Sequence, residues 1–212
     1  MSPIKKPIRQ VNRLQLQAAL LTAFLLGGIS GYGIAIYLPE FSLQKVAILS
    51  HSIPTKHPTI ADSKPIQVRF SPGGQCTAFV VQAIQSTQKT ILVQAYSFTC
   101  PQIVGALIDA KKRGVAVKVL VDRSQLTARS SKVSQVLAAG IPIAIDQVPG
   151  IAHNKVMIID DEYVLTGSFN WTAAAEKRNA ENLLLIRDPD IHELYRENWE
   201  KRAMGAQLMH NP

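Results

Sequence analysis

Residues between positions 153 and 170 combine the side chains that chemistry at a phosphodiester requires. His153 has an imidazole that can attack phosphorus or move a proton near neutral pH, and Lys155 adds a fixed positive charge. Alternate residues of a strand share one face, so both side chains can reach the same anionic group. Ser168 and Asn170 follow and could donate hydrogen bonds to charge that grows in the transition state.

Two short strands joined by a turn would bring these side chains together. Residues 156–159 are an apolar run of strand formers, and the aspartate pair that begins at Asp160 marks a turn. A second strand over residues 163–166 leads back to Gly167, where the lack of a side chain lets the backbone bend. We therefore expect a hairpin whose open end holds the whole cluster.

The pattern continues to Glu181 and resembles the signature of the phospholipase D superfamily. The motif residues that carry the resemblance are His153-x-Lys155, Asp160, Gly167-Ser168-x-Asn170 and Glu181-Asn182. Further back it includes Phe70-Ser71-Pro72, Ala95-Tyr96-Ser97-Phe98-Thr99 and Ala110-Lys111-Lys112-Arg113-Gly114. Residues 66–199 are similar to the small bacterial periplasmic endonucleases of this superfamily. The resemblance to mitochondrial cardiolipin hydrolase is more distant, since the cysteine and histidine cluster typical of those relatives is missing.

The resemblance implies an α/β fold in which helices flank a mixed β-sheet on both faces. It also implies a phosphodiesterase that forms a phosphohistidine on His153 and needs no metal or other cofactor. In that scheme Lys155 contacts the non-bridging oxygens and Glu181 holds one ring nitrogen of the histidine. We interpret Asp160 and Gly167 as structural parts of the motif, because a turn and a bend explain them.

One chain carries only one copy of the motif, whereas the family's mechanism uses two histidines. The other four histidines lack the accompanying lysine; they are His51, His57, His192 and His210. A two-fold homodimer would place two copies of His153 face to face. We therefore expect an active site shared across a dimer interface, with one histidine as nucleophile and its counterpart as general acid.

Basic residues near the motif suggest a polyanionic substrate. They are Arg123, Arg129 and Lys132 after the third expected strand, and Lys177 and Arg178 after the hairpin. An ordinary solvated surface is the alternative for these five. We expect a non-specific endonuclease acting on DNA or RNA, with a phospholipase D acting on a membrane phospholipid such as cardiolipin as the second hypothesis. An inactive nucleic-acid-binding scaffold is the third.

The N-terminal part of the chain has the pattern of a membrane segment. Four cations precede an uncharged stretch over residues 14–39, and without them the net charge of +8 falls to +4. We expect residues 1–39 to be a signal anchor or a cleaved signal peptide, which exports the domain to the periplasm, either attached to the inner membrane or free. Residues 40–64 would be a linker, residues 65–204 the catalytic domain and residues 205–212 a tail.

Strands and helices alternate after Pro65, which is typical of βαβ units. Expected strands cover residues 66–70, 91–96, 115–121, 141–145 and 182–187 besides the hairpin, and helices end near Ile84, Arg113, Ala139 and Arg202. Cys76 and Cys100 form no metal-binding cluster. They could pair in a disulfide if the first two strands are neighbours, or remain two buried thiols.

Overall fold

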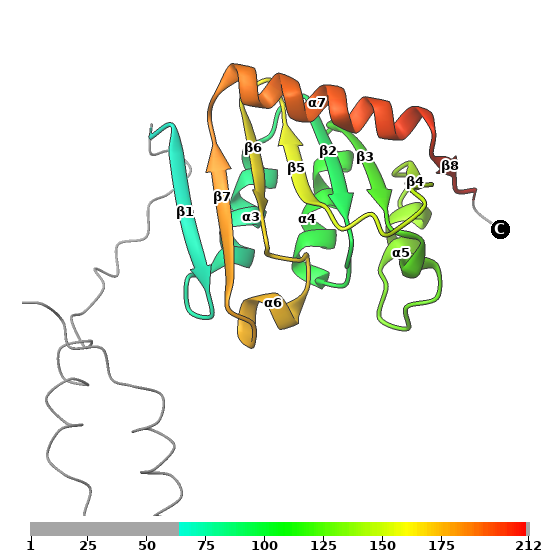
Figure 1. Cartoon of the computed structure of the whole chain (residues 1–212), viewed down its shortest axis with the longest axis horizontal. Helices are drawn as coiled ribbons and strands as arrows, with labels where there is room; N and C mark the ends of the chain where they lie inside the picture. Colours follow the sequence, from blue (N-terminus) through cyan, green and yellow to red (C-terminus); the bar gives the residue numbers. More distant parts are fainter. Residues whose placement is uncertain (1–63, 211–212) are drawn as a thin grey trace, which may run out of the picture. The chain divides into compact units, whose positions relative to one another are not determined.

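An eight-stranded mixed sheet forms the middle layer of the protein, in the order β1-β7-β6-β5-β2-β3-β4-β8 (Figure 1). The computed structural model describes residues 64–210. Its strands are β1 (Ile66–Ser71), β2 (Thr90–Ala95), β3 (Ala116–Val121), β4 (Ile143–Ile145), β5 (Lys155–Ile159), β6 (Tyr163–Gly167), β7 (Glu181–Ile186) and β8 (Gln207–Leu208). Strands β2, β3 and β4 are parallel, and all other neighbours are antiparallel.

Helices cover both faces of this sheet. They are α3 (Cys76–Ser86), α4 (Pro101–Lys112), α5 (Val133–Ala138), α6 (Ala173–Lys177) and α7 (Pro189–Met204), with a 3-10 turn η1 (Arg123–Leu126). Figure 1 shows α3 and α4 behind the sheet and α7 across its front. Every residue of β5 is buried, because this central strand has helices on both sides. Its uninterrupted apolar run is the sequence pattern of such a strand.

The fold expected from the sequence, a mixed sheet with helices on both faces, is confirmed. Within the expected tail, residues 205–212, the short strand β8 pairs with β4. The backbone N–H of Met209 also donates to the carbonyl of Ile143 at 2.9 Å. The expected membrane segment and most of the linker lie outside the described residues. Within residues 64–210 no helix has both the length and the apolar character that a membrane crossing requires.

The disulfide considered for Cys76 and Cys100 is not formed. Both residues are buried, free thiols, and Cys100 Sγ donates to the Gln102 side chain at 3.2 Å. The condition for pairing also fails, since β7, β6 and β5 lie between β1 and β2 in the sheet. The two cysteines instead begin neighbouring helices and pack into the main core.

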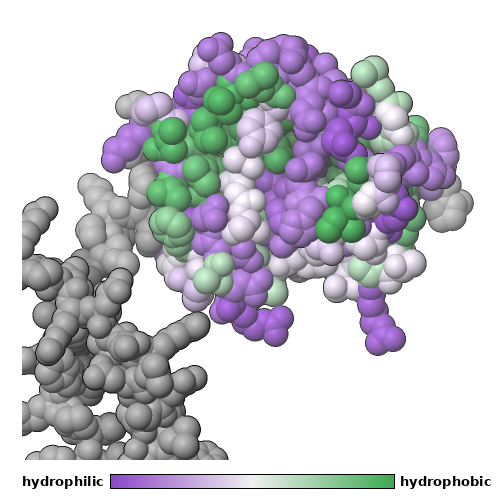
Figure 2. Space-filling model, in the orientation of Figure 1, coloured by the Kyte–Doolittle hydropathy of each residue, from purple (hydrophilic) through white to green (hydrophobic). Residues whose placement is uncertain are grey.

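Edge strand β1 turns its apolar side chains outward. Ile66, Val68 and Phe70 are 58%, 46% and 63% exposed, while the alternate residues Gln67 and Arg69 are buried. Leu184 and Ile186 of β7 lie beside them in register and are half-buried. Figure 2 shows hydrophobic side chains gathered over β1 and β7. We call these five apolar residues the β1 apolar face; its exposure is unusual, because a strand normally directs its apolar side to the core.

Candidate active site

Six residues of the sequence motif line one pocket of about 370 Å³. They are His153, Lys155, Gly167, Ser168, Asn170 and Glu181. The pocket lies where β5 and β7 begin and β6 ends, because β5 and β7 both pair antiparallel with β6. The pairing of Ala95 with Lys155 places the end of β2 at the same edge of the sheet. The hairpin expected from the sequence therefore forms and assembles the predicted cluster.

His153 is exposed and lies two residues before β5, on a segment that Asp122 holds in place. Asp122 is 2% exposed and accepts from the backbone N–H groups of Ala152 at 2.7 Å and Ser124 at 2.9 Å. Burial acts to raise the pKa of Asp122, but these hydrogen bonds outweigh it and hold the pKa below its usual value. The sequence interpretation missed this residue, although an acidic group directly after a buried strand was a visible signal.

Lys155 is the first residue of β5 and is only 6% exposed. Its Nζ donates to the carbonyl of His153 at 2.7 Å and lies 4.9 Å from the centre of the Tyr96 ring. Burial lowers the pKa of Lys155, and the negative charge of Glu181 opposes that shift. A buried ammonium group with few partners is suited to bind the oxygens of an incoming anion.

Glu181 contacts different residues from those expected. Ser168 Oγ donates to one carboxylate oxygen at 2.5 Å, and Asn179 Nδ2 donates to the other at 2.9 Å. The expected hydrogen bond from Glu181 to the His153 ring is absent from the described part of the chain. Both carboxylate oxygens have nearer donors, so Glu181 fixes Ser168 and supplies negative charge near Lys155. Asn179 was not anticipated from the sequence.

Asn170 presents an unsatisfied polar atom to the pocket. Its side-chain Oδ1 is buried and has no hydrogen-bond partner within the described residues. Buried polar atoms are nearly always paired, and those that are not often mark a ligand position. Rotation of the Asn170 side-chain amide by 180° would place its NH2 donor at the same position.

Asp160 lies at the opposite end of β5 from the pocket. Its carboxylate accepts from the backbone N–H groups of Gln88, Lys89 and Thr90 at 3.0, 2.7 and 2.8 Å. The buried His192 contacts the carbonyl of Asp160 through Nε2 at 2.9 Å. These contacts fit the structural role expected for Asp160, which caps the loop before β2.

The five basic residues expected near the substrate do not line the pocket, but they follow elements at the same edge of the sheet. Arg123 and Arg129 are exposed and Lys132 is half-buried, all after the end of β3. Lys177 and Arg178 are exposed at the end of α6, after β6. Figure 1 shows α6 and the loop before α5 at the same edge of the sheet. The two aromatic residues nearest the motif, Phe169 and Trp171, are fully buried in the core.

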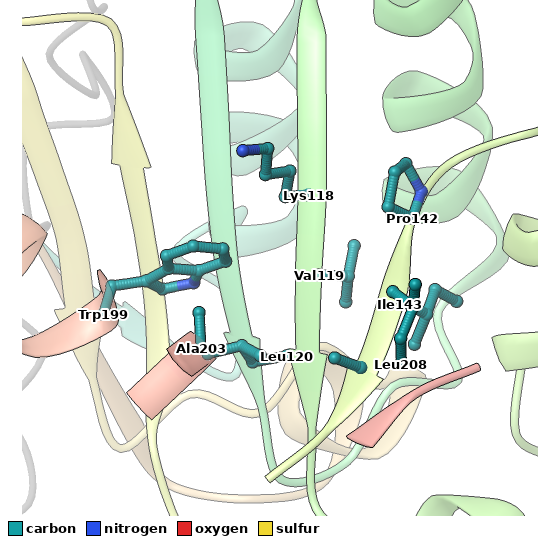
Figure 3. A pocket seen from close by; sticks show the side chains of 9 residues that line it. Lys118, Val119, Leu120, Pro142, Ile143, Trp199, Ala203 and Leu208 are labelled. Carbon is teal, nitrogen blue, oxygen red and sulfur yellow. The ribbon is translucent and has the colours of Figure 1, made fainter. Parts of the chain in front are cut away.

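A second pocket of about 250 Å³ is apolar and shares no lining residue with the first. It lies between α7 and strands β3, β4 and β8 (Figure 3). Its walls include Leu120, Ile143, Trp199, Ala203 and Leu208. Among residues 64–210, no group of three or more His, Cys, Asp or Glu side chains is arranged to hold a metal ion.

Comparison with known proteins identifies the family. Residues 80–203 match the family model described as "Cardiolipin synthase, PLD-like domain". The chain is 48% identical over 171 residues to "Phospholipase D" of Rickettsia prowazekii, which covers 81% of each protein. It is 33% identical over 114 residues to "Mitochondrial cardiolipin hydrolase" of Xenopus tropicalis, covering 54% of each.

A solved structure supports the same assignment. The phospholipase D family member Nuc from Salmonella typhimurium is 41% identical, with a TM-score of 0.65 over 69% of this chain and 98% of Nuc. NucT from Helicobacter pylori has the same fold, with a TM-score of 0.63 at 23% identity over 68% of this chain and 98% of NucT. The chain therefore belongs to the phospholipase D superfamily and is a phosphodiesterase of the nuclease or phospholipase D type.

Proposed function

We propose that this protein hydrolyses phosphodiester bonds through a phosphohistidine and without a metal ion. The observation that carries the proposal is the pocket itself, where exposed His153 and buried Lys155 lie beside the unsatisfied side chain of Asn170. A ring nitrogen of His153 attacks phosphorus, and the bond to the leaving oxygen breaks as that oxygen takes a proton. Water then attacks the phosphohistidine and releases the second product.

Lys155 and Asn170 stabilise the charge on the phosphoryl oxygens during both steps. The ammonium group of Lys155 provides the positive charge that a metal ion provides in other phosphodiesterases. Its low exposure strengthens the interaction, because water screens a buried charge less than an exposed one. Glu181 binds Ser168 and keeps that side of the pocket in place.

The general acid comes from a second copy of the chain in this proposal. Among the described residues His153 is the only histidine that lines the pocket, and an isologous dimer would supply another. The β1 apolar face supports the idea, since it leaves three large apolar side chains exposed. The face is also close to the site, because Phe70 pairs with Asn182, the residue after Glu181.

Nucleic acid is the substrate that we propose. Basic side chains lie on two sides of the pocket, after β3 and after α6, where a long polyanion can contact both groups. The pocket itself is lined by polar residues and one glycine. It suits a phosphate with little base recognition, so we expect a non-specific endonuclease.

A membrane phospholipid is the second candidate, favoured by relatives named phospholipase D, such as the Rickettsia prowazekii protein. We also propose that residues 1–39 export the domain and hold it at the inner membrane, facing the periplasm, unless they are cleaved. That position would bring lipid headgroups within reach. The apolar pocket under α7 shares no residue with the active site, which leaves the route of an acyl chain unexplained.

Incubation of the full-length protein in detergent with plasmid DNA, RNA or cardiolipin vesicles, each in EDTA, tests these proposals. We expect nicked and fragmented nucleic acid, with no phosphatidate released from the vesicles. Release of phosphatidate alone would make the protein a phospholipase. Activity that requires an added divalent metal would contradict the mechanism, and the His153→Asn protein controls for contaminating nucleases.

A further inference from the structure

The Tyr96 ring contacts both members of the proposed catalytic pair, His153 and Lys155. Tyr96 directly follows β2 and is half-buried. Its ring centroid lies 4.4 Å from that of the His153 imidazole, with 59° between the planes. Lys155 Nζ lies 4.9 Å from the centre of the same ring. One aromatic side chain therefore touches both residues without lining the pocket.

The imidazole of His153 has no other means of fixing its direction within the described residues. Its ring makes no hydrogen bond there, and the carboxylate expected to hold it, Glu181, binds Ser168 and Asn179. An exposed side chain without such a bond samples several rotamers. Packing against an aromatic ring restricts those rotamers, and tilted ring pairs are a favourable arrangement.

Backbone hydrogen bonds hold the main chain at Tyr96 beside the motif. The N–H of Tyr96 donates to the carbonyl of Asn154, which lies between His153 and Lys155, at 3.0 Å. Farther along the same segment, the N–H groups of Thr99 and Cys100 donate to the carbonyl of Trp171 at 3.0 and 2.9 Å. The loop after β2 thus connects to both halves of the motif, next to His153 and next to Asn170.

We propose that Tyr96 is a positioning residue, which directs the His153 imidazole at the phosphate and holds the positive charge of Lys155. The face of an aromatic ring attracts cations, so it favours the ammonium group and the imidazolium that forms when His153 acts as an acid. The ring supplies this effect, and the hydroxyl has no part in it. The predicted effect of Tyr96 on kcat rests on the proposed phosphodiesterase function.

The test compares Tyr96→Leu with Tyr96→Phe in the full-length protein. Tyr195→Leu is the matched control, because this half-buried tyrosine lies on α7 and packs against the small cluster under that helix. For the substrate that the wild type cleaves, we expect Tyr96→Leu to lower kcat about 30- to 100-fold with KM changed less than about threefold, because the nucleophile is misdirected. Tyr96→Phe and Tyr195→Leu should stay within about threefold of wild type.

Nuclear magnetic resonance of histidine labelled with 13C at Cε1 gives a second readout that does not need activity. The His153 signal, assigned by its loss in His153→Asn, should move in Tyr96→Leu and stay in place in Tyr96→Phe. Unchanged kcat and an unmoved His153 signal in Tyr96→Leu would overturn the proposal. An equal loss of kcat in Tyr96→Phe and Tyr96→Leu would also overturn it. A wild type that cleaves no substrate would refute the proposed function, while the signal would still decide the contact.

Discussion

Two buried charged residues of opposite sign prepare the site around His153. Asp122 is 2% exposed and Lys155 is 6% exposed. Asp122 is stabilised by backbone N–H groups, and one of these belongs to Ala152, the residue before His153. Lys155 has a carbonyl and an aromatic face as partners, with Glu181 nearby. The carboxylate of Asp122 therefore holds the backbone next to His153, and the ammonium group of Lys155 remains able to bind the substrate.

Asp122→Asn should lower the free energy of unfolding by about 2 kcal/mol at pH 7, because an amide nitrogen then faces a backbone donor. The pKa of Asp122 is depressed in the folded state, so its contribution is present above the unfolded pKa and is lost as pH falls. The difference in free energy of unfolding between wild type and variant, measured in urea, should stay constant above about pH 5 and decrease below about pH 4.

A matched control for that experiment is Asp161→Asn. Asp161 pairs with Lys89 on the surface, where the two side chains are 79% and 70% exposed, so little change is expected. For Asp122→Asn we also expect kcat to fall about tenfold, because the segment that carries His153 loosens. A stability gap of the same size at pH 3.5 and pH 7 would contradict this account.

The residues of the motif could be predicted from the sequence because they are close together along the chain. Tyr96 and Asp122 were not assigned to the site, since they come from the ends of β2 and β3 and meet His153 only after the sheet forms. Glu181 was predicted as a site residue but with the wrong partner. Hydrogen-bond partners depend on distances of a few tenths of an ångström, which spacing in the sequence does not provide.

At the scale of elements, the close approach of β6 and β7 is the critical feature. Gly167 has a φ of 149°, and a Cβ placed there would lie 2.4 Å from the backbone oxygen of Asn182. Just beyond it, the N–H groups of Ser168 and Phe169 donate to that same oxygen at 3.2 Å. The lack of a side chain at Gly167 therefore lets the end of the hairpin approach β7, the strand that carries Glu181.

Gly167→Ala should destabilise the protein by about 3 kcal/mol, because the clash is with backbone that cannot turn aside. Gly140→Ala separates this effect from backbone strain alone, since Gly140 has a φ of 74° with no atom within 4 Å of an added Cβ. That control should lose only about 1 kcal/mol. Chemical denaturation measures both, and equal losses would show that the contact with Asn182 is unimportant.

The strands other than β8 could be predicted to within about two residues, because apolar runs and turn residues define them locally. Their order could not. Strand β1 follows the linker and precedes α3, yet it pairs with β7 near the other end of the domain. Contacts so distant in sequence leave no periodic signal, and the outward apolar side chains of β1 give the reverse of the usual pattern.

At the scale of the whole molecule, the proposed dimer would link the active site to the β1 apolar face. Among residues 64–210, no histidine besides His153 lines the pocket, and none of the labelled helices lies in front of β1 in the view of Figure 1. We propose that a second copy packed on the first accounts for both features. The proposed dimer would bury the face and complete the site at the same time.

Mixing experiments test the shared site. If two copies of His153 make one site, an equal mixture of wild type and His153→Asn that exchanges subunits should retain about a quarter of the activity, against about a half for independent subunits. Val68→Lys should also give slower-sedimenting, inactive protein. Leu194→Lys is its control, because Leu194 is 61% exposed on α7. A fully active monomer in sedimentation would rule out the shared site.

Strand β5 explains why the motif lysine and aspartate are separated by a fixed number of residues. It is buried along its whole length, with Lys155 at the pocket and Asp160 just past its other end, capping the loop before β2. Five residues of strand span about 16 Å along the strand direction, which separates the pocket end of β5 from the end near Asp160. The number of residues between Lys155 and Asp160 therefore fixes the distance between the pocket and the loop before β2. Deleting one residue from β5 would shift its register with the neighbouring strands and turn Lys155 to the opposite face of the sheet. We expect this to disturb the site more than exchanging any single side chain of the strand.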